Sequence, residues 1–175
     1  MSRRKIVLLG EIGVGKTSVI RRFVLDRFET TYKGTLGYNI YTSAIVGVGP
    51  NQSETLELLI WDTDGSHGDR LLAQKPVVQG TSAVLIVADL TRPRTLATMA
   101  HLARSVETGL PGRHVHLILN KSDLLEGLTT DAKTLTLPAE LDGLIHPIIR
   151  TSAKSGENIQ QAFRETANAI LRRGL

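Results

Sequence analysis

Gly10-Glu-Ile-Gly-Val-Gly-Lys-Thr17 is the stretch that decides the fold, because it has the spacing G-x-x-x-x-G-K-[ST]. The apolar run Lys5–Leu9 precedes it, and apolar residues at helical spacing follow it. The glycines let the backbone bend around a phosphate chain and point N–H groups inward, and the start of a helix adds the positive end of its dipole. We interpret the stretch as a phosphate-binding loop, in which Lys16 reaches the β- and γ-phosphates and the Thr17 hydroxyl ligates Mg²⁺. A glycine-rich turn before an ordinary helix is the weaker alternative.

The composition is that of a globular protein, with 41% hydrophobic and 22% charged residues. The length suits one domain, residues 1–175. The longest apolar run is too short to cross a bilayer, and the first predicted strand leaves no room for a signal peptide. No cysteine is present for disulfides, thiolate metal sites or lipidation. We therefore expect a cytoplasmic location.

The formal net charge of +4 is compatible with weak attraction to nucleic acid or to an anionic membrane. The basic residues, however, occur as scattered pairs such as Arg3-Arg4 and Arg172-Arg173. No basic stripe with interleaved aromatic residues is visible, of the kind that stacks single-stranded bases. We expect no direct nucleic-acid partner.

Strands alternate with helices along the chain, which predicts a mostly parallel α/β sheet. Ligands of such sheets gather at the carboxyl ends of the strands. Exposed loops are expected at 28–37 and 62–80, and the pattern between 124 and 144 is too interrupted to interpret. The predicted strands are 5–9, 38–48, 55–61, 83–88, 114–119 and 146–150, and the second and third of these form an antiparallel hairpin. The predicted helices begin near Lys16 and cover 93–109 and 158–171.

Ile60-Trp-Asp-Thr-Asp-Gly65 places Asp62 at the carboxyl end of a predicted strand. An acidic residue there can hold the Mg²⁺ of a phosphate-binding loop, commonly through water. The N–H of Gly65 could approach a γ-phosphate because no Cβ obstructs it. Taken alone, Asp-x-x-Gly is also an ordinary turn.

Asn120-Lys-Ser-Asp123 follows another predicted strand, and Thr151-Ser-Ala-Lys154 follows the last. The Asp123 carboxylate can accept two parallel hydrogen bonds from guanine, whereas adenine lacks that donor pair. Asn120 can bridge the base and the backbone, while Lys121 and Lys154 cover the two faces of the ring and the Ala153 N–H meets guanine O6. Each motif alone could be a simple turn.

These motifs, in this order, resemble those of the Ras superfamily of small GTPases, and most closely its Rab-like branch. The resemblance implies a G domain with the P-loop NTPase fold: a mostly parallel six-stranded sheet with one antiparallel edge strand and helices on both faces. It also implies binding of GTP or GDP with Mg²⁺, with Thr35 a metal ligand only when GTP is bound. Phe28 would pack against guanine, and Tyr32 would cover the phosphates.

The residues expected at the site fall into three overlapping groups. Those expected to bind nucleotide are Gly13, Val14, Gly15, Lys16, Thr17, Ser18, Phe28, Tyr32, Thr35, Gly65, Asn120, Lys121, Asp123, Ser152, Ala153 and Lys154. Those expected to hold the metal are Thr17, Thr35 and Asp62. Those expected to act in hydrolysis are Lys16, Thr35, Gly65, Ser66 and His67.

The departures from the family pattern concern hydrolysis. Ser66 stands where the family carries a glutamine that orients the attacking water. Asp64 would place a repelling carboxylate near the γ-phosphate, and Ile12 would crowd the water-positioning space. His67 could substitute for the glutamine, although a solvated loop histidine is the stronger interpretation. We expect slow or partner-dependent turnover.

Three functions are therefore weighed: a GTP/GDP switch, a non-hydrolysing guanine-nucleotide-binding module, and an RNA-associated GTPase. For the switch, we expect effector and regulator proteins, including an exchange factor and an activating protein, to bind the loops at 28–38 and 62–80. The sequence stops at Arg172-Arg-Gly-Leu175 without the prenylated cysteines usual for Rab-like proteins. We interpret this as a protein without a lipid anchor, as in bacterial Ras-like GTPases, in preference to a trimmed sequence.

Overall fold

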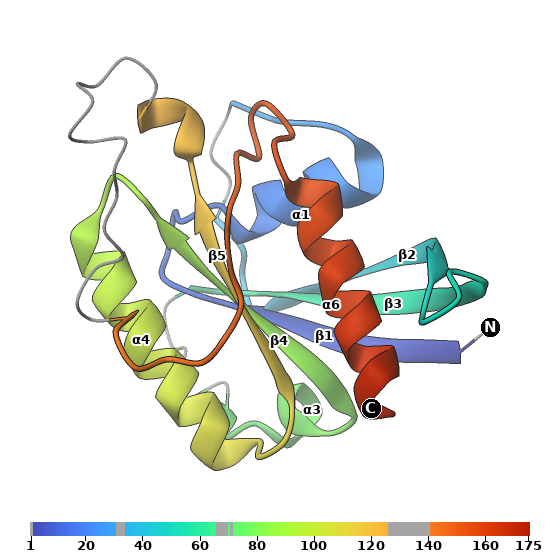
Figure 1. The fold of residues 1–175 in the computed structure, drawn as a ribbon. Coiled ribbons are helices and arrows are strands. Elements are labelled where there is room, and N and C mark those ends of the chain that lie inside the picture. The colour runs from blue at the N-terminus through green and yellow to red at the C-terminus, as the bar shows by residue number, and fades with distance from the viewer. Residues whose placement is uncertain (1, 31–33, 66–69, 71, 126–140) are drawn as a thin grey trace.

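A six-stranded sheet forms the centre of this computed structural model, which describes residues 2–30, 34–65, 70, 72–125 and 141–175 (Figure 1). The strand order is β2-β3-β1-β4-β5-β6. β2 pairs antiparallel with β3 at one edge, and the other neighbouring strands pair in parallel, as predicted. The strands are β1 Ser2–Leu9, β2 Tyr38–Val48, β3 Glu54–Thr63, β4 Thr81–Asp89, β5 His114–Asn120 and β6 Ile148–Arg150. The helices are α1 Lys16–Leu25, α3 Lys75–Val78, α4 Pro93–Gly109, α6 Ile159–Arg173 and the short 3₁₀ helix η1 Ser122–Leu125.

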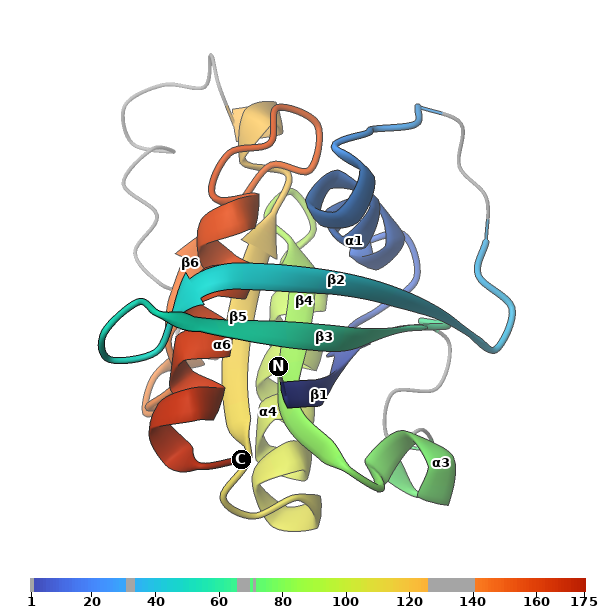
Figure 2. The same cartoon turned by 90° about the vertical axis from the view of Figure 1, so that its right-hand side faces the viewer.

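Helices cover both faces of the sheet, because successive strand residues point to opposite faces. In β1, Ile6 packs with α1 and α6, whereas the next residue, Val7, packs with α4. Figures 1 and 2 show the same arrangement, with α1 and α6 on one side and α4 on the other. Phe23 of α1 and Phe163 of α6 stack with their ring centroids 3.9 Å apart. The two resulting cores pack closely against the sheet, and the packed sheet fixes the points from which the loops at its carboxyl edge extend.

The last strand is shorter than the sequence pattern predicts. A strand was expected over 146–150, but β6 begins only at Ile148. Pro147 has no N–H to donate to the ladder, although its carbonyl accepts a hydrogen bond from the Leu117 N–H at 2.9 Å. The second loop, expected at 62–80 with at most a short helix, contains the four-residue helix α3 near its end. β1, β3 and β4 each begin one to three residues before the predicted start.

Among the described residues, no helix is both long and apolar enough to span a membrane.

Candidate nucleotide-binding site

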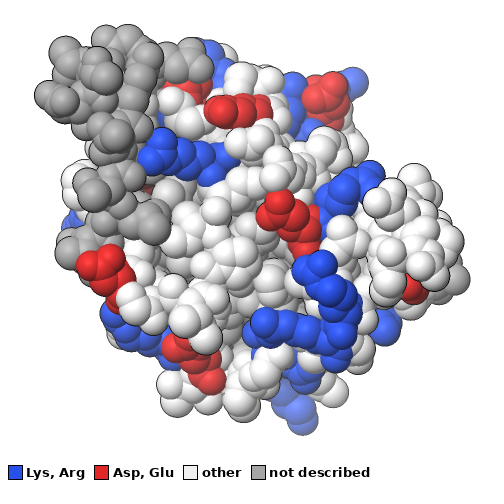
Figure 3. Space-filling model, in the orientation of Figure 1, with Lys and Arg blue, Asp and Glu red and all other residues white. Residues whose placement is uncertain are grey.

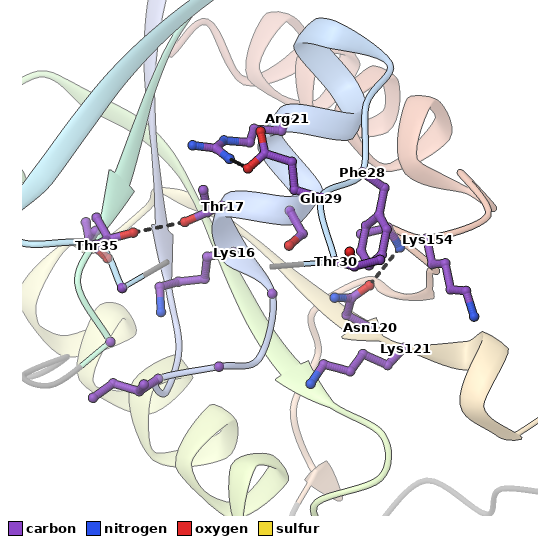
Figure 4. Close-up of a pocket in the computed structure, with 18 of the residues that line it drawn as sticks. Lys16, Thr17, Arg21, Phe28, Glu29, Thr30, Thr35, Asn120, Lys121 and Lys154 are labelled. Carbon is purple, nitrogen blue, oxygen red and sulfur yellow. Dashed lines mark hydrogen bonds and ion pairs between the residues drawn. The ribbon is translucent and has the colours of Figure 1, made fainter. Parts of the chain in front are cut away.

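A cavity of about 710 Å³ opens at the carboxyl ends of β1, β3, β5 and β6. In Figure 4, Thr17, Thr35 and Lys16 lie at one end, and Phe28, Asn120, Lys121 and Lys154 lie at the other. The predicted site residues that line it are Gly13, Gly15, Lys16, Thr17, Ser18, Phe28, Thr35, Gly65, Asn120, Lys121, Asp123, Ala153 and Lys154. Val14, Asp62 and Ser152 are fully buried beside it. Tyr32, Ser66 and His67 lie outside the described residues. The volume is typical of a small-molecule or cofactor site.

The loop between β1 and α1 places the N-terminus of a helix against this cavity. Gly15 caps α1 in the left-handed conformation, with φ +99°. A Cβ at Gly15 would also lie 2.4 Å from Asn120 Nδ2, so any larger residue would push the two segments apart. The N–H groups of the first turn of α1, from Lys16 to Ser18, have no carbonyl partner within the helix. They are placed to bind an anion, as predicted for a phosphate-binding loop.

The Lys16 amine lies inside the loop. Lys16 is only 6% exposed, and its Nζ donates to the carbonyls of Gly10, at 2.8 Å, and Glu11, at 3.0 Å. Burial lowers the pKa of Lys16 to about 8, although the nearby carboxylates of Asp62 and Asp64 partly offset this effect. A phosphate chain in the cavity would favour the charged amine.

Three oxygen-bearing side chains predicted as metal ligands converge beside Lys16. The Thr17 hydroxyl donates to Asp62 Oδ2 at 2.7 Å and lies 3.0 Å from the Thr35 hydroxyl, which must therefore be the donor of that second bond. Asp62 is fully buried, burial raises its pKa, and its Oδ1 has no hydrogen-bond partner among the described residues. An unpartnered buried carboxylate oxygen beside two hydroxyls fits a hard cation such as Mg²⁺.

Asn120 joins the phosphate-binding loop to the loop after β6. Its Nδ2 donates to the Val14 carbonyl at 2.9 Å, while its Oδ1 accepts from the Ala153 N–H at 3.1 Å and from the Thr151 hydroxyl at 3.3 Å. The predicted role of Asn120, a bridge between the base and the backbone, stays a prediction, and the bridge seen here joins two protein segments. The Ala153 N–H, predicted to meet guanine O6, donates to Asn120 in this structure. Val14 meets Asn120 through its backbone, because its side chain is in the core.

The Asp123 carboxylate is oriented by a residue that the motif did not assign to this role. Ser152 donates its hydroxyl to Asp123 Oδ1 at 2.6 Å, and Lys154 Nζ lies 4.0 Å from Oδ2. The buried serine therefore holds the carboxylate in place, and Asp123 itself lines the cavity. This arrangement suits an acceptor for the paired donors of a guanine edge.

Several polar residues at or beside the cavity were not predicted from the sequence. Arg21, Glu29, Thr30 and Thr63 line it, and Asp89 and Arg92 contact residues that line it. Asp89, at the carboxyl end of β4, accepts from Lys121 Nζ at 2.6 Å and from Arg92 Nε at 2.9 Å. Arg92 in turn reaches the phosphate-binding loop, where its Nη2 donates to the Ile12 carbonyl at 3.0 Å. The position of Asp89 at the edge where ligands gather is a signal that could have identified it. Arg92 carries no such signal.

The segment after β3 lies directly against the phosphate-binding loop. A Cβ at Gly65 would be 2.4 Å from the Ile12 nitrogen and 2.5 Å from the Glu11 carbonyl carbon. Glycine is therefore required here for a close backbone approach, in addition to the predicted access to a γ-phosphate. Asp64 and Ile12 both line the cavity, and Ile12 is 53% exposed. Both residues expected to hinder hydrolysis are thus close to the predicted phosphate end.

The fold and the site together define a P-loop nucleotide-binding protein: a helix N-terminus and a buried lysine for phosphates, oxygen ligands for a cation, and a carboxylate for a base. A family model described as "Ras family" matches residues 5–172, and the chain belongs to that family of GTP-binding switch proteins.

The individual relatives place it in the Rab branch. Human Rab-22A is 34% identical over 171 residues, covering 95% of this chain and 82% of the relative. Human Rab-31 is 32% identical over 167 residues, with coverages of 95% and 82%. RABF2b of Arabidopsis thaliana is 31% identical over 169 residues, with coverages of 96% and 81%. The expected resemblance is confirmed.

Proposed function

We propose that this protein is a Mg²⁺-dependent switch that binds GTP and GDP and hydrolyses GTP slowly unless a partner assists. The observation that carries the proposal is the convergence of Thr17, Thr35 and the buried Asp62 beside the Lys16 amine, at one end of the cavity that Asp123 also lines. The residues expected to hold the metal and those expected to bind the base therefore lie at two ends of one cavity. A guanine nucleotide with its cation matches both ends.

Bound Mg²⁺ would supply charge neutralisation at the phosphates, and Thr17, Thr35 and Asp62 are the residues that would hold it. Lys16 and the first N–H groups of α1 neutralise and orient the phosphate chain. Asp123 selects guanine by accepting its paired donors. Because Thr35 belongs to the segment 34–37 and not to the rigid sheet, its engagement orders that segment.

The ordered segments form the proposed partner surface. We expect effectors, an exchange factor and an activating protein to bind the loops at 28–38 and 62–80. The support is a hydrogen bond that joins these loops, from the Asp64 N–H to the Gly37 carbonyl at 2.8 Å. Capture of partners with protein loaded with GDP or with a non-hydrolysable GTP analogue tests this, and equal capture in both states would contradict it.

Slow hydrolysis is supported by two side chains at the predicted phosphate end. The Asp64 carboxylate would repel both the γ-phosphate and a hydroxide-like nucleophile. The exposed Ile12 side chain would occupy the space that a water-positioning group or an arginine from a partner needs. Neither residue hinders binding of GDP, which lacks the γ-phosphate.

Single-turnover GTP hydrolysis by the isolated chain tests this proposal. We expect a rate far below that of partner-stimulated GTPases. Ser66→Gln should accelerate hydrolysis only when Ile12→Gly and Asp64→Ala are also present, so the single, double and triple variants should be compared. A fast rate in the unmodified chain would contradict slow turnover while leaving GTP binding intact.

A non-hydrolysing guanine-nucleotide-binding module is the second candidate, favoured by the same Asp64 and Ile12 positions. Nucleotide retained through purification, analysed together with turnover, separates the two functions. Retained GTP without any conversion to GDP supports the module.

An RNA-associated GTPase has less support. Figure 3 shows acidic side chains interspersed among basic ones on the face that it draws, although basic side chains gather over one end of α6. Salt-dependent RNA binding would be required to favour this function.

A further inference from the structure

Arg92 lies at the start of α4, outside the family motifs, yet it touches the phosphate-binding loop. One guanidinium group makes two bonds in different directions: Nε to Asp89 Oδ2 at 2.9 Å and Nη2 to the Ile12 carbonyl at 3.0 Å. Its guanidinium nitrogens also lie 3.7 and 4.0 Å from the place where a Cβ on Gly13 would sit. The planar fork of arginine carries donors on separate nitrogens, so it reaches two acceptors that lie in different directions, whereas a lysine amine offers all its donors from one atom.

Asp89 connects this contact to the base-binding end of the cavity. The carboxylate is 2% exposed, and its Oδ2 accepts from both Arg92 and Lys121, at 2.9 and 2.6 Å. Its Oδ1 accepts from the Thr91 N–H and hydroxyl at 3.0 and 2.7 Å, which fixes the carboxylate plane. Lys121 lines the cavity. A continuous path of ion pairs and hydrogen bonds therefore runs from Lys121 through Asp89 and Arg92 to the Ile12 carbonyl.

We infer that Arg92 is a positioning residue that fastens the phosphate-binding loop to the base-binding segment, and that this link slows the release of guanine nucleotide. The inference rests on the proposed function. Nucleotide release requires the two ends of the cavity to separate or loosen, and Arg92 is tied to both. The Arg92 side chain is 42% exposed, so it contributes to the position of the phosphate-binding loop and little to the packing of the core.

Loss of Arg92 should leave the fold intact. Asp89 keeps its ion pair with Lys121 and its bonds to Thr91, and the Ile12 carbonyl can accept from water at the exposed surface. Arg94 provides a matched control on the same helix. It is 90% exposed, carries the same charge, and its Nε lies 3.7 Å from Glu11 Oε1, but it makes no described contact with Asp89 or Ile12.

The experiment measures the dissociation rate of a fluorescent GDP analogue with Mg²⁺ present, for wild type, Arg92→Gln, Arg92→Lys and Arg94→Gln. We expect release about three- to tenfold faster for R92Q, as for loss of a partly exposed charge-assisted contact. R92K should fall between wild type and R92Q, and R94Q should match wild type. Thermal midpoints of the four proteins without nucleotide should agree closely.

Rescue by R92K separates a positioning role from a general structural role. A lysine at this position keeps a positive charge near Asp89 and the Ile12 carbonyl, so it should restore part of the slow release. A loss caused by a general disturbance of the structure would not be rescued by charge.

Three results decide the matter. R92Q release within twofold of wild type overturns the positioning role, and so does an equal acceleration by R94Q. A wild-type chain that binds no guanine nucleotide overturns the proposed function and this inference with it.

Discussion

Raising the pH should weaken nucleotide binding because of the buried Lys16 amine. Its pKa is about 8, since burial disfavours the charged form. Phosphate oxygens beside Nζ favour the charged form, so the pKa in the complex lies well above 8. Binding must therefore take up a proton whenever the free amine is neutral. A proton on the GDP phosphate would behave in the opposite way, because binding at lower pH would release it to the solvent.

The magnitude follows from one titrating group. With a pKa of about 8, the free amine is neutral in about a quarter of molecules at about pH 7.5 and in about three quarters at about pH 8.5. GDP binding should take up the same fractions of a proton. The affinity should fall about threefold between these pH values, or about 0.7 kcal/mol.

Isothermal titration calorimetry in two buffers with different ionisation enthalpies measures this proton uptake directly. Guanosine is the control, because it shares the ionisation of the guanine base but has no phosphate to meet Lys16. We expect proton uptake to rise more for GDP than for guanosine, and the difference between the two belongs to Lys16. The same proton number for GDP at both pH values would refute the reasoning.

The same pKa affects the stability of the nucleotide-free fold. The unfolded lysine has a pKa of about 10.4, so between about pH 8 and about pH 10.4 the unfolded chain binds more protons than the folded one. In that interval Lys16 makes the free energy of unfolding increase as the pH rises. Bound nucleotide should remove this dependence.

Three further perturbations act on separate parts of the molecule. Asp62→Asn keeps the shape of the side chain but removes its charge beside Thr17. Mg²⁺ should therefore slow GDP release in wild type and much less in the variant. An equal effect of Mg²⁺ on both proteins would argue against Asp62 as a metal ligand. Gly65→Ala would place a Cβ 2.4 Å from the Ile12 nitrogen, and we expect nucleotide affinity to fall about tenfold or more in equilibrium titration, with unchanged affinity contradicting the close approach. Burial lowers the pKa of His114 to about 4, so protonation favours the unfolded chain as the pH falls from about 6.5 to about 4. Urea unfolding at about pH 4.5 should show that His114 lowers the free energy of unfolding by about 2 kcal/mol. His114→Val should remove this loss.

Sequence reasoning brought together the residues that a parallel sheet places at one edge. Asp62 and Asn120 lie at the carboxyl ends of β3 and β5, and Thr17 lies just beyond the loop that follows β1. The carboxyl ends of parallel strands meet. Each motif indicates both the chemistry of its residue and its position along the chain. The convergence of the hydroxyl and carboxylate oxygens could therefore be predicted without knowing the paths of the loops. The antiparallel edge formed by β2 was also predictable, because a short turn joins it to β3.

Loop-to-loop contacts were not predictable in the same way. Arg92 reads as an ordinary residue before a helix beginning at Pro93, and nothing in its neighbours indicates that it reaches Ile12 across 80 positions of sequence. Ser152 was predicted only as a nucleotide-binding residue. Its hydrogen bond to Asp123 was not predicted, because the acceptor that a buried hydroxyl finds depends on how the two loops meet. Such contacts depend on where each turn leaves the sheet, which local patterns do not encode.

The hydrogen bond between Asp64 and Gly37 has a consequence for how such a switch would work. Thr35 can be held by a cation at the phosphate end, and Gly65 lies against the phosphate-binding loop, so each loop has its own means of sensing the nucleotide. The Asp64 N–H also donates to the Gly37 carbonyl, next to the β2–β3 pair Tyr38–Thr63, so the two loops are joined where they leave the sheet. Their ordering should therefore be cooperative. A partner that contacts only one loop would still detect the state of both.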